Sequence, residues 1–336
     1  MLKLWLISVC AILLFIGCEQ SGRITLPVFH AGSLSAPMER MEEVFEKRHP
    51  HVDVQRQAYG SAMAIRQVTE LGKPADVLGS ADYKLIDRMM IEGEEPVAAW
   101  NLLFASNGMC IAHNENWPED AEWPDILGRG DITVGISNPN HDPCGYRSVI
   151  AMCLAEENVD GGAGLFDKVI GENSDITRRQ EDGGWVIDVP TDPAARGRLK
   201  IRPKETDLIA LLNSGAIDCM LIYRSVAVEQ GLDYVALPPE VNLAAPDMNS
   251  LYESVRLVMF ADRRDKSIEV SGSSITYGLT VPTDAPHPDM AEKFVDLVLS
   301  EEGSTILKEC GLKPLSPRYS RKSKSQPRKF QSPDEE

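Results

Sequence analysis

The stretch that decides the fold reads VFHAGSLSAPM and covers residues 28–38. An apolar run over residues 24–29 predicts a buried strand, and the small polar residues after it predict a turn. A helix follows this turn, because Ser35 suits its cap and Pro37 suits its first position. Such a turn leaves backbone N–H groups unpaired at the positive end of a helix dipole, where an anion can bind. An ordinary capped helix has the same features, so the turn alone does not decide between these interpretations.

The same order of elements is repeated in the next part of the chain. Residues 51–58 alternate in hydrophobicity and predict a second strand, after which Gly60 and Ser61 form a second turn that opens a helix. Residues 74–82 predict a third, short strand with a polar end. Strands that alternate with helices predict a parallel α/β sheet. Ligands of such sheets bind at the carboxyl ends of the strands, where Ser33 and Ser61 both lie.

The composition predicts a folded protein with an acidic body. The chain has 336 residues, of which 43% are hydrophobic and 25% charged, and this length favours two lobes over one. The net charge is −17, and residues 18–316 hold 27 Lys and Arg against 48 Asp and Glu. Nucleic acid is therefore excluded as the expected partner. An anionic ligand would have to be held by local N–H groups against this overall charge.

Residues 1–18 have the pattern of an export signal. Lys3 is their only charge, and the apolar core over residues 4–16 is shorter than the roughly 20 residues that a membrane span needs. The segment ends in Phe-Ile-Gly-Cys, which resembles a lipobox, although Phe15 stands where Leu is usual. We therefore expect a signal peptide with a lipobox, lipidation at Cys18, and a protein anchored to the outer face of the cell membrane. A plain secretory signal is the alternative.

Five cysteines follow Cys18, and their spacing is irregular. An odd number without a CxxC pair indicates neither a disulfide framework nor a zinc site. We expect mostly buried, small hydrophobic side chains. One disulfide remains open, and the sequence does not identify its partners among Cys110, Cys144, Cys153, Cys219 and Cys310.

Three polar residues in the second half of the chain stand next to predicted strands. Asp142 follows a strand over residues 131–136 and suits the N-cap of a helix. Glu205 stands just before another predicted helix, and Tyr223 ends a buried strand over residues 217–222. Each has a structural interpretation, as a cap, a solvated residue and an interfacial core tyrosine, respectively. Each could equally line a cleft at the carboxyl ends of the strands.

Several longer segments carry a family resemblance. They read HAGSLSAPM, YGSAMAIRQ, PADVLGSADY, GISNPNHDPCGYRS, RPKETDLIALLNSGAIDCMLIYRSVA and ITYGLTVPTDAPHPDMAEKFVDLVLSEEG. In this order, they resemble the substrate-binding proteins of archaeal-type tungstate/molybdate ABC importers. The resemblance covers nearly all of residues 24–316, and it is far more specific than a single Gly-Ser turn.

This resemblance implies an α/β fold of the type II periplasmic-binding-protein class. Two lobes would form a clamp, each lobe a mixed, mainly parallel sheet flanked by helices, with two hinge crossings between them. We name residues 19–105 and 277–316 lobe I, and residues 106–276 lobe II. Residues 317–336 hold six basic and three acidic groups, and we expect them to form a disordered basic tail.

The resemblance also implies which groups bind the oxygen atoms of the ligand. Ser33 and Ser61 would donate hydroxyl and backbone N–H hydrogen bonds from lobe I. Cys144 would donate its backbone N–H from lobe II, where related bacterial proteins have a small residue. Tyr223 would donate its phenol. None of these groups requires a resident cofactor.

Two carboxylates would bind the metal centre of the ligand and expand the tetrahedral oxyanion to six-coordinate. By motif they are Asp142 and Glu205, although Asp207 stands close enough in sequence to take the place of Glu205. Two anionic groups would repel a sulfate or phosphate in a dry cleft. Molybdenum and tungsten accept further oxygen ligands, so these carboxylates favour tungstate or molybdate. The sequence does not rank these two dianions of similar size.

The implied function is capture of tungstate or molybdate and delivery to the permease and ATPase of an ABC importer, by a monomer. A binding protein for sulfate, phosphate or ferric iron would share the fold, although ferric sites favour Tyr or His clusters that the sequence lacks. A secreted hydrolase is the enzyme alternative. Ser33, His30 and Asp142 can be written as a triad, but there is no Gly-x-Ser-x-Gly elbow, HExxH or Walker loop. We expect a binding protein and not an enzyme.

Overall fold

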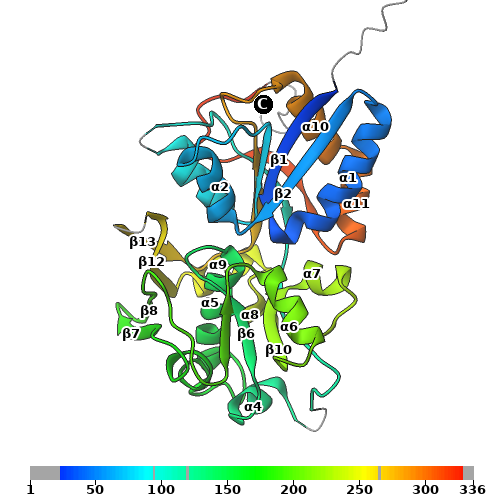
Figure 1. Cartoon of the computed structure of the whole chain (residues 1–336). Helices are drawn as coiled ribbons and strands as arrows, with labels where there is room; N and C mark the ends of the chain where they lie inside the picture. The colour runs from blue at the N-terminus through cyan, green and yellow to red at the C-terminus, as the bar shows by residue number, and fades with distance from the viewer. Residues whose placement is uncertain (1–22, 94, 119–120, 264–265, 328–336) are drawn as a thin grey trace, which may run out of the picture.

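The computed structural model describes residues 23–327, apart from residues 94, 119–120 and 264–265. The predicted signal peptide and Cys18 lie outside these residues. The chain folds into two lobes, with lobe I at the top and lobe II at the bottom of Figure 1. Both lobes contain mixed sheets flanked by helices, as the resemblance implied. The sheets are not mainly parallel, however, because three of the five strand pairings in the sheet of lobe I are antiparallel. In the described part of the chain, no helix combines the length and the apolar character needed to cross a membrane.

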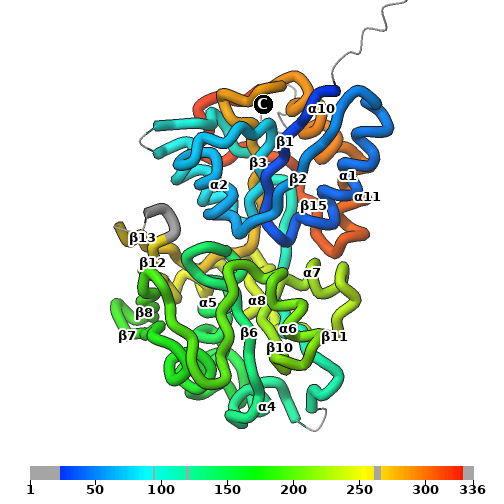
Figure 2. The backbone as a smooth tube through the Cα atoms, viewed as in Figure 1, coloured from blue at the N-terminus to red at the C-terminus, as the bar shows by residue number. Residues whose placement is uncertain are grey.

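Lobe I is built on a six-stranded sheet with the strand order β15-β4-β14-β3-β1-β2. Its strands are β1 Ile24–Ala31, β2 Val52–Tyr59, β3 Val77–Ser80, β4 Leu102–Ser106, β14 Thr276–Thr280 and β15 Lys313–Tyr319. β1 pairs in parallel with β2 and β3, whereas β14 is antiparallel to β3 and β4. The carboxyl ends of β1 and β2 lie at the side of lobe I that faces lobe II (Figure 2).

Helices cover both faces of this sheet. They are η1 Gly32–Leu34, α1 Ser35–Arg48, α2 Ser61–Thr69, α3 Tyr83–Ile86, η2 Asp87–Ile91, α10 Pro288–Leu299 and α11 Glu301–Glu309. α1, α10 and α11 gather on one face and α2 lies on the other (Figure 1). The apolar stripe of α1 is buried at Met38, Met41 and Phe45. Phe45 packs edge-on against Phe294 of α10, with ring centroids 5.3 Å apart, which joins the two helices.

Lobe II contains two sheets. A five-stranded sheet has the order β11-β5-β10-β6-β9, and a four-stranded sheet has the order β13-β12-β8-β7. The strands are β5 Met109–His113, β6 Val134–Ser137, β7 Thr177–Glu181, β8 Gly184–Asp188, β9 Leu199–Arg202, β10 Cys219–Tyr223, β11 Asp233–Ala236, β12 Val255–Arg263 and β13 Lys266–Ser271. Residues 171–200 are polar and rich in Gly, Asp and Arg, a composition that predicts an irregular segment with one possible strand over residues 185–189. β8 overlaps that strand, but a second sheet was not expected.

One long helix organises the core of lobe II. α5, Pro143–Asn158, is buried throughout Pro143–Ala155, and it starts at the side of lobe II that faces lobe I. The other helices are α4 Trp123–Gly128, η3 Asp167–Gly171, η4 Glu205–Leu208, α6 Ile209–Asn213, α7 Arg224–Glu229, α8 Pro239–Asn242, η5 Pro246–Met248 and α9 Asn249–Tyr252. The buried helix therefore holds the residues at its N-terminus, including its N-cap Asp142, in place.

Two expectations about local structure are wrong. Ser35 does not cap α1: the 3-10 turn η1 comes first, Ser35 is the first residue of the helix, and its Oγ donates to the carbonyl of Gly32 at 2.7 Å. The tail is not disordered from residue 317, because β15 continues to Tyr319 and the described chain runs on to Pro327. Ser320 is buried and donates to the Asp87 carboxylate at 2.6 Å. Paired backbone and buried side chains thus order a segment that has little apolar content.

All five cysteines in the described part of the chain are buried and free. Burial raises the pKa of the Cys110 thiol to about 12, and it also raises the pKa of Cys144, Cys153, Cys219 and Cys310. The possible disulfide is therefore not formed, and these thiols act as small hydrophobic side chains, as expected.

Candidate functional site

The two Ser turns of lobe I bring Ser33 and Ser61 to the interface between the lobes. Ser33 lies in η1 after β1, Ser61 is the first residue of α2 after β2, and both side chains are buried. The backbone N–H of Ala81 donates to the Ser61 hydroxyl at 2.9 Å. The Tyr277 hydroxyl donates to the Ser33 hydroxyl at 2.9 Å. Each serine oxygen thus accepts one hydrogen bond and keeps its own proton for another acceptor.

Asp142 joins two turns of lobe II. It caps α5, as predicted, because its Oδ1 accepts the backbone N–H of Cys144 at 3.0 Å. Its Oδ2 accepts the backbone N–H of Glu205 at 2.8 Å. The Cys144 N–H that the resemblance assigns to the oxyanion is therefore already hydrogen-bonded to Asp142. Asp142 is both a cap and a carboxylate at the interface between the lobes.

Glu205 is the least satisfied side chain of this cluster. It is 1% exposed, and neither carboxylate oxygen has a hydrogen-bond partner among the described residues. A methyl group placed on Gly32 of lobe I would lie 3.2 Å from Glu205 Oε1, so this carboxylate faces the turn that carries Ser33. Burial, and next the charge of Asp142, raise the pKa of Glu205 well above its ordinary value. A buried carboxylate without a partner is costly and points to a ligand.

Asp207, the alternative to Glu205, has a different environment. Its carboxylate is 34% exposed and forms an ion pair with Lys204 at 3.8 Å. Both residues belong to η4, but only Glu205 turns toward Asp142 and lobe I. The geometry therefore pairs Asp142 with Glu205.

Tyr223 ends β10 with its side chain fully buried. Arg147 of α5 donates to the Tyr223 hydroxyl at 2.6 Å, and the same nitrogen donates to the carbonyl of Ala81 in lobe I at 2.7 Å. Since a guanidinium has only donors, the phenol oxygen accepts and its proton is left for another acceptor. Burial raises the pKa of Tyr223, so the phenol keeps this proton. The Tyr223 phenol thus has a proton that no described residue accepts, and its donation to a ligand stays a prediction.

Arg147 also connects the lobes through a charged group. Its guanidinium lies 3.9 Å from the Asp82 carboxylate of lobe I, and the Tyr146 hydroxyl donates to the same carboxylate. Burial alone would raise the pKa of Asp82, but Arg147, Lys84 and Tyr146 together lower it below the ordinary value. Arg147 was not singled out from the sequence, because nothing in its local pattern distinguishes a buried arginine from a solvated one.

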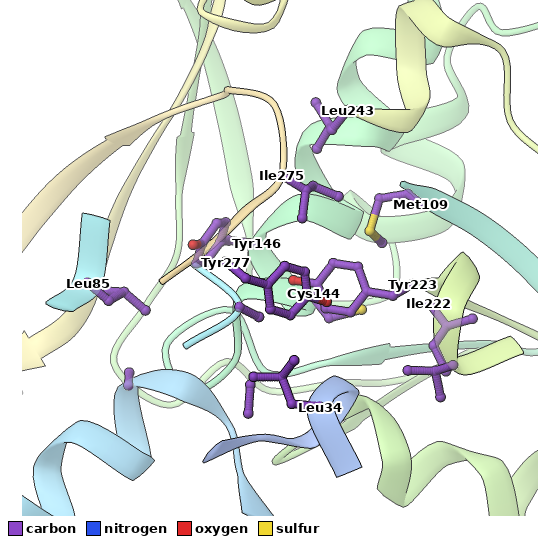
Figure 3. Packing of buried hydrophobic residues seen from close by; sticks show 14 of the residues in the cluster. Leu34, Leu85, Met109, Cys144, Tyr146, Ile222, Tyr223, Leu243, Ile275 and Tyr277 are labelled. Atoms are coloured by element: carbon purple, nitrogen blue, oxygen red, sulfur yellow. The ribbon is translucent and has the colours of Figure 1, made fainter. Parts of the chain in front are cut away.

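The lobes are in close contact around the site. A methyl group on Gly60 of lobe I would lie 2.2 Å from the carbonyl oxygen of His141 in lobe II. Figure 3 shows the side chains of Tyr223, Tyr277 and Cys144 gathered between the lobes, near Leu34. The rings of Tyr223 and Tyr277 are 6.3 Å apart between centroids. The structure is therefore a closed clamp, with the predicted site residues enclosed.

A cleft beside the site opens toward the surface. Its volume is about 440 Å³, and it is lined by Gly32 and Ser35 of lobe I and by η4, α6 and α7 residues of lobe II, namely Thr206, Ile209, Ala210, Asn213, Val226, Glu229 and Gln230. Gly32 lines this cleft and also lies next to the Glu205 carboxylate. Gly32 is thus the residue that connects this cleft with the enclosed site.

Within the described residues, no three His, Cys, Asp or Glu side chains gather in a group that could hold a metal ion. The site offers two carboxylates and several donors, which suits an anion that brings its own oxygen ligands better than a bare cation. His30 does not complete a triad with Ser33, since its Nδ1 bonds the carbonyl oxygen of Ala31 at 2.8 Å. Burial lowers the pKa of His30 to about 4, so the ring is neutral.

Fold and site together define a two-lobed protein with a cluster of buried polar groups between its lobes. The chain matches the bacterial extracellular solute-binding protein family over residues 26–313, and it belongs to this family. Members of this family bind solutes for transport and are not enzymes. The hydrolase alternative is thereby excluded.

Two relatives cover most of the chain. The molybdate/tungstate-binding protein WtpA of Pyrococcus abyssi is 36% identical over 328 residues, which are 92% of each chain. An uncharacterized solute-binding protein of Methanoculleus marisnigri is 38% identical over 299 residues, which are 88% of this chain and 82% of that protein. These relatives agree with the family assignment.

Among solved structures, the periplasmic molybdate-binding protein of Azotobacter vinelandii is similar with a TM-score of 0.58 and 17% identity, over 85% of this chain and 98% of that chain. The sulfate-binding protein SubI of Mycobacterium tuberculosis has a TM-score of 0.56 and 15% identity, over 87% of each chain. At these identities the similarity concerns the fold alone, and the two ligands named differ.

Proposed function

We propose that this solute-binding protein captures tungstate or molybdate between its lobes and delivers it to the permease and ATPase of an ABC importer. The observation that carries the proposal is the buried pair of carboxylates, Asp142 and Glu205, at the contact between the lobes. The 36% identity to the molybdate/tungstate-binding protein of Pyrococcus abyssi supports the same ligand class.

The charges of this site favour a metal oxyanion over other anions. Two unit charges about 4 Å apart at an effective dielectric of about 20 repel by about 4 kcal/mol, so a carboxylate next to sulfate oxygens is unfavourable. Tungsten and molybdenum can accept carboxylate oxygens as additional ligands, which turns the repulsion into bonding. In this proposal Asp142 and Glu205 bind the metal centre, while Ser33, Ser61 and Tyr223 donate to the oxygens of the ligand.

Cys144 has a smaller role in this proposal than its motif implies. Its N–H is bonded to Asp142 at 3.0 Å, so it acts by holding that carboxylate unless the turn rearranges around the ligand. Arg147 supplies positive charge from behind Tyr223. No resident cofactor takes part.

Hydrogen phosphate is the second candidate, and one observation favours it. Both oxygens of Glu205 are without a partner, and a protonated anion could donate its hydrogen to one of them. Sulfate carries no such proton at neutral pH and would meet only repulsion.

Isothermal titration calorimetry with tungstate, molybdate, sulfate and phosphate separates these candidates. We expect tungstate and molybdate to bind at least about 100-fold more tightly than the other two, since loss of two carboxylate bonds would cost several kcal/mol. Tighter binding of phosphate would assign Glu205 to a proton of the ligand. Binding of sulfate as tight as that of tungstate would contradict both assignments.

We further propose that the mature protein is a monomer anchored to the outer face of the cell membrane through lipid on Cys18. The support is the sequence pattern of residues 1–18 and the family, whose members act outside the cytoplasm. An anchored protein would stay near the importer that it serves.

A further inference from the structure

Asn107 lies between β4 of lobe I and β5 of lobe II, where the chain first crosses from one lobe to the other. Its side-chain amide has a fixed orientation. Asn107 is 6% exposed. Its Oδ1 accepts the backbone N–H groups of Gly108 at 2.9 Å and Ser225 at 3.3 Å. Backbone N–H groups can only donate, so the oxygen of the amide must point toward them. The Nδ2 group therefore points the other way.

This orientation determines the direction of a chain of hydrogen bonds that ends at the site. Nδ2 of Asn107 donates to the Tyr277 hydroxyl at 2.9 Å, and the Tyr277 hydroxyl donates to the Ser33 hydroxyl at 2.9 Å. An amide nitrogen has no lone pair to accept with, so the Tyr277 proton can only go forward to Ser33. Ser33 accepts there, and its own proton is left to point elsewhere.

The hydroxyl groups of Ser61 and Tyr223 also accept a hydrogen bond from the protein. Ser61 accepts from the backbone N–H of Ala81, and Tyr223 accepts from the guanidinium of Arg147. Each of these partners is also an obligate donor. All three hydroxyl groups thus keep a proton for the ligand. An oxyanion without protons needs donors at every oxygen, and this arrangement supplies them before the ligand arrives.

We propose that Asn107 is a positioning residue for oxyanion binding, which acts through Tyr277 to make Ser33 a hydrogen-bond donor. The proposal rests on the proposed function, because it takes Ser33 as a contact of the anion. Asn107 itself does not touch the ligand. It selects for ligands whose oxygens only accept, and it does so from the crossing between the lobes.

The substitution Asn107→Asp reverses the chain without changing its shape. The new carboxylate still accepts from Gly108 and Ser225, and it also accepts from Tyr277. Tyr277 then donates to this carboxylate instead of to Ser33, so its oxygen becomes an acceptor that competes with the anion for the Ser33 proton. One lost hydrogen bond to a charged group predicts a tungstate dissociation constant about 10–100-fold larger in calorimetry.

The double variant with Tyr277→Phe separates this direction effect from charge and packing. Without the phenol, Ser33 keeps its proton whichever side chain stands at position 107, so the loss caused by Asn107→Asp should shrink to less than about threefold. Adding Tyr277→Phe to Asn107→Asp should therefore restore binding. Asn107→Ala, which adds no charge, should weaken binding by about 3–10-fold, and again only when Tyr277 is present.

The outcomes of this cycle are distinct. An equal loss from Asn107→Asp in both backgrounds, in variants that melt cooperatively, would overturn the role of Asn107 while the proposed function stands. Unchanged tungstate binding in both Asn107→Asp and Asn107→Ala would overturn it as well. If the wild-type protein binds none of tungstate, molybdate, sulfate and phosphate, the proposed function fails and this inference falls with it.

Discussion

The Oδ2 atom of Asp142 accepts the backbone N–H of Glu205 at 2.8 Å, so one carboxylate fixes the position of the residue that carries the other. Asp142 is compensated by two backbone N–H groups, from Glu205 and from Cys144. Glu205 has no such partner among the described residues. The pair is thus one satisfied and one unsatisfied carboxylate, and the second is the group that gains most from a ligand.

Replacement of Glu205 by its amide tests this asymmetry. Glu205→Gln removes a buried charge that has no partner, so the ligand-free protein should be unchanged or more stable, by up to about 2 kcal/mol. Tungstate affinity should fall at least about tenfold, since one bond to the metal is lost. Asp207→Asn is the matched control, because that carboxylate is only partly buried, is paired with Lys204 and belongs to the same turn. Calorimetry and thermal melting of both variants give the answer.

Asp142→Asn should behave differently from Glu205→Gln. Its amide nitrogen would face one of the two backbone N–H groups that the carboxylate now accepts, and this loss should cost about 1–3 kcal/mol of stability as well as affinity. Should Asp207→Asn weaken tungstate binding while Glu205→Gln does not, the second metal ligand would be Asp207. Full affinity in both amide variants would contradict the metal-ligand role altogether.

The pH dependence of binding distinguishes a metal oxyanion from other anions. Burial and Asp142 raise the pKa of Glu205, so part of the free protein has this group protonated when ordinary carboxyls are ionised. A carboxylate that bonds to tungsten must be ionised, so tungstate affinity should rise with pH through that raised pKa, with a slope of at most about one proton. Sulfate affinity should fall over the same range, because ionisation only adds repulsion. Calorimetry with Glu205→Gln should show neither slope; a tungstate affinity that falls with pH would oppose the proposal.

The free energy of unfolding of the ligand-free protein should depend on Glu205 in the opposite direction to the tungstate affinity. Because the folded protein holds the Glu205 proton more tightly than the unfolded chain, this contribution is fully present below about pH 4.3 and is lost as pH rises through the raised pKa. His30 acts in reverse: its pKa is lowered to about 4, so its contribution is present above about pH 6.5 and lost as pH falls toward 4. The free energy of unfolding can be measured with denaturant at several pH values for the wild type and for Glu205→Gln. The difference between the two proteins isolates the Glu205 contribution.

Gly60→Ala should hinder closure of the clamp without harming either lobe. The new methyl group would lie 2.2 Å from the carbonyl oxygen of His141, which belongs to the other lobe and cannot yield as a flexible side chain can. Gly128→Ala at the end of α4 is the control, since the nearest atom to its methyl group would be Lys168 Nζ at 3.8 Å. We expect Gly60→Ala to lower tungstate affinity at least tenfold, by about 1.4 kcal/mol or more. Small-angle scattering should show that tungstate contracts the wild type and the Gly128→Ala variant but not Gly60→Ala; contraction of all three would refute the contact.

Cys18→Ala tests the lipid anchor. Removal of the thiol that would carry the lipid should release the protein into the soluble exported fraction or leave the signal unprocessed. Fractionation of cells that express each form, with Cys310→Ala as a control for the loss of a cysteine, provides the measurement. An unchanged membrane fraction in Cys18→Ala would rule out lipidation at this residue.

Much of the fold is predictable from local patterns. The strand–turn–helix segments around Ser33 and Ser61 have strong hydrophobic periodicity, and the cap at Asp142 follows from its place before Pro143. The extra sheet of lobe II and the course of β15 were missed, because their strands pair with segments distant in sequence: β8 pairs with β12, and β15 pairs with β4. Local propensity carries no information about such partners.

The candidate site, like the fold, was predicted from the sequence only in part. The five side chains that the motifs name, Ser33, Ser61, Asp142, Glu205 and Tyr223, are all buried near the contact between the lobes. The groups that direct them, Asn107, Arg147 and Tyr277, were not found from the sequence. They act through hydrogen bonds to residues between 66 and 244 positions away, and no spacing rule connects such partners. A buried arginine or asparagine is identified only when the fold shows what surrounds it.

X-ray absorption at the tungsten edge of the wild-type complex tests the central claim most directly. If Asp142 and Glu205 bond to the metal, the bound tungstate is six-coordinate, with four oxo oxygens and two longer bonds to carboxylate oxygens. In the Glu205→Gln variant the spectrum should move toward that of the free tetrahedral ion. A wild-type complex whose tungsten has only its four oxo ligands would contradict the account, because the two carboxylates would then face the anion as repelling charges.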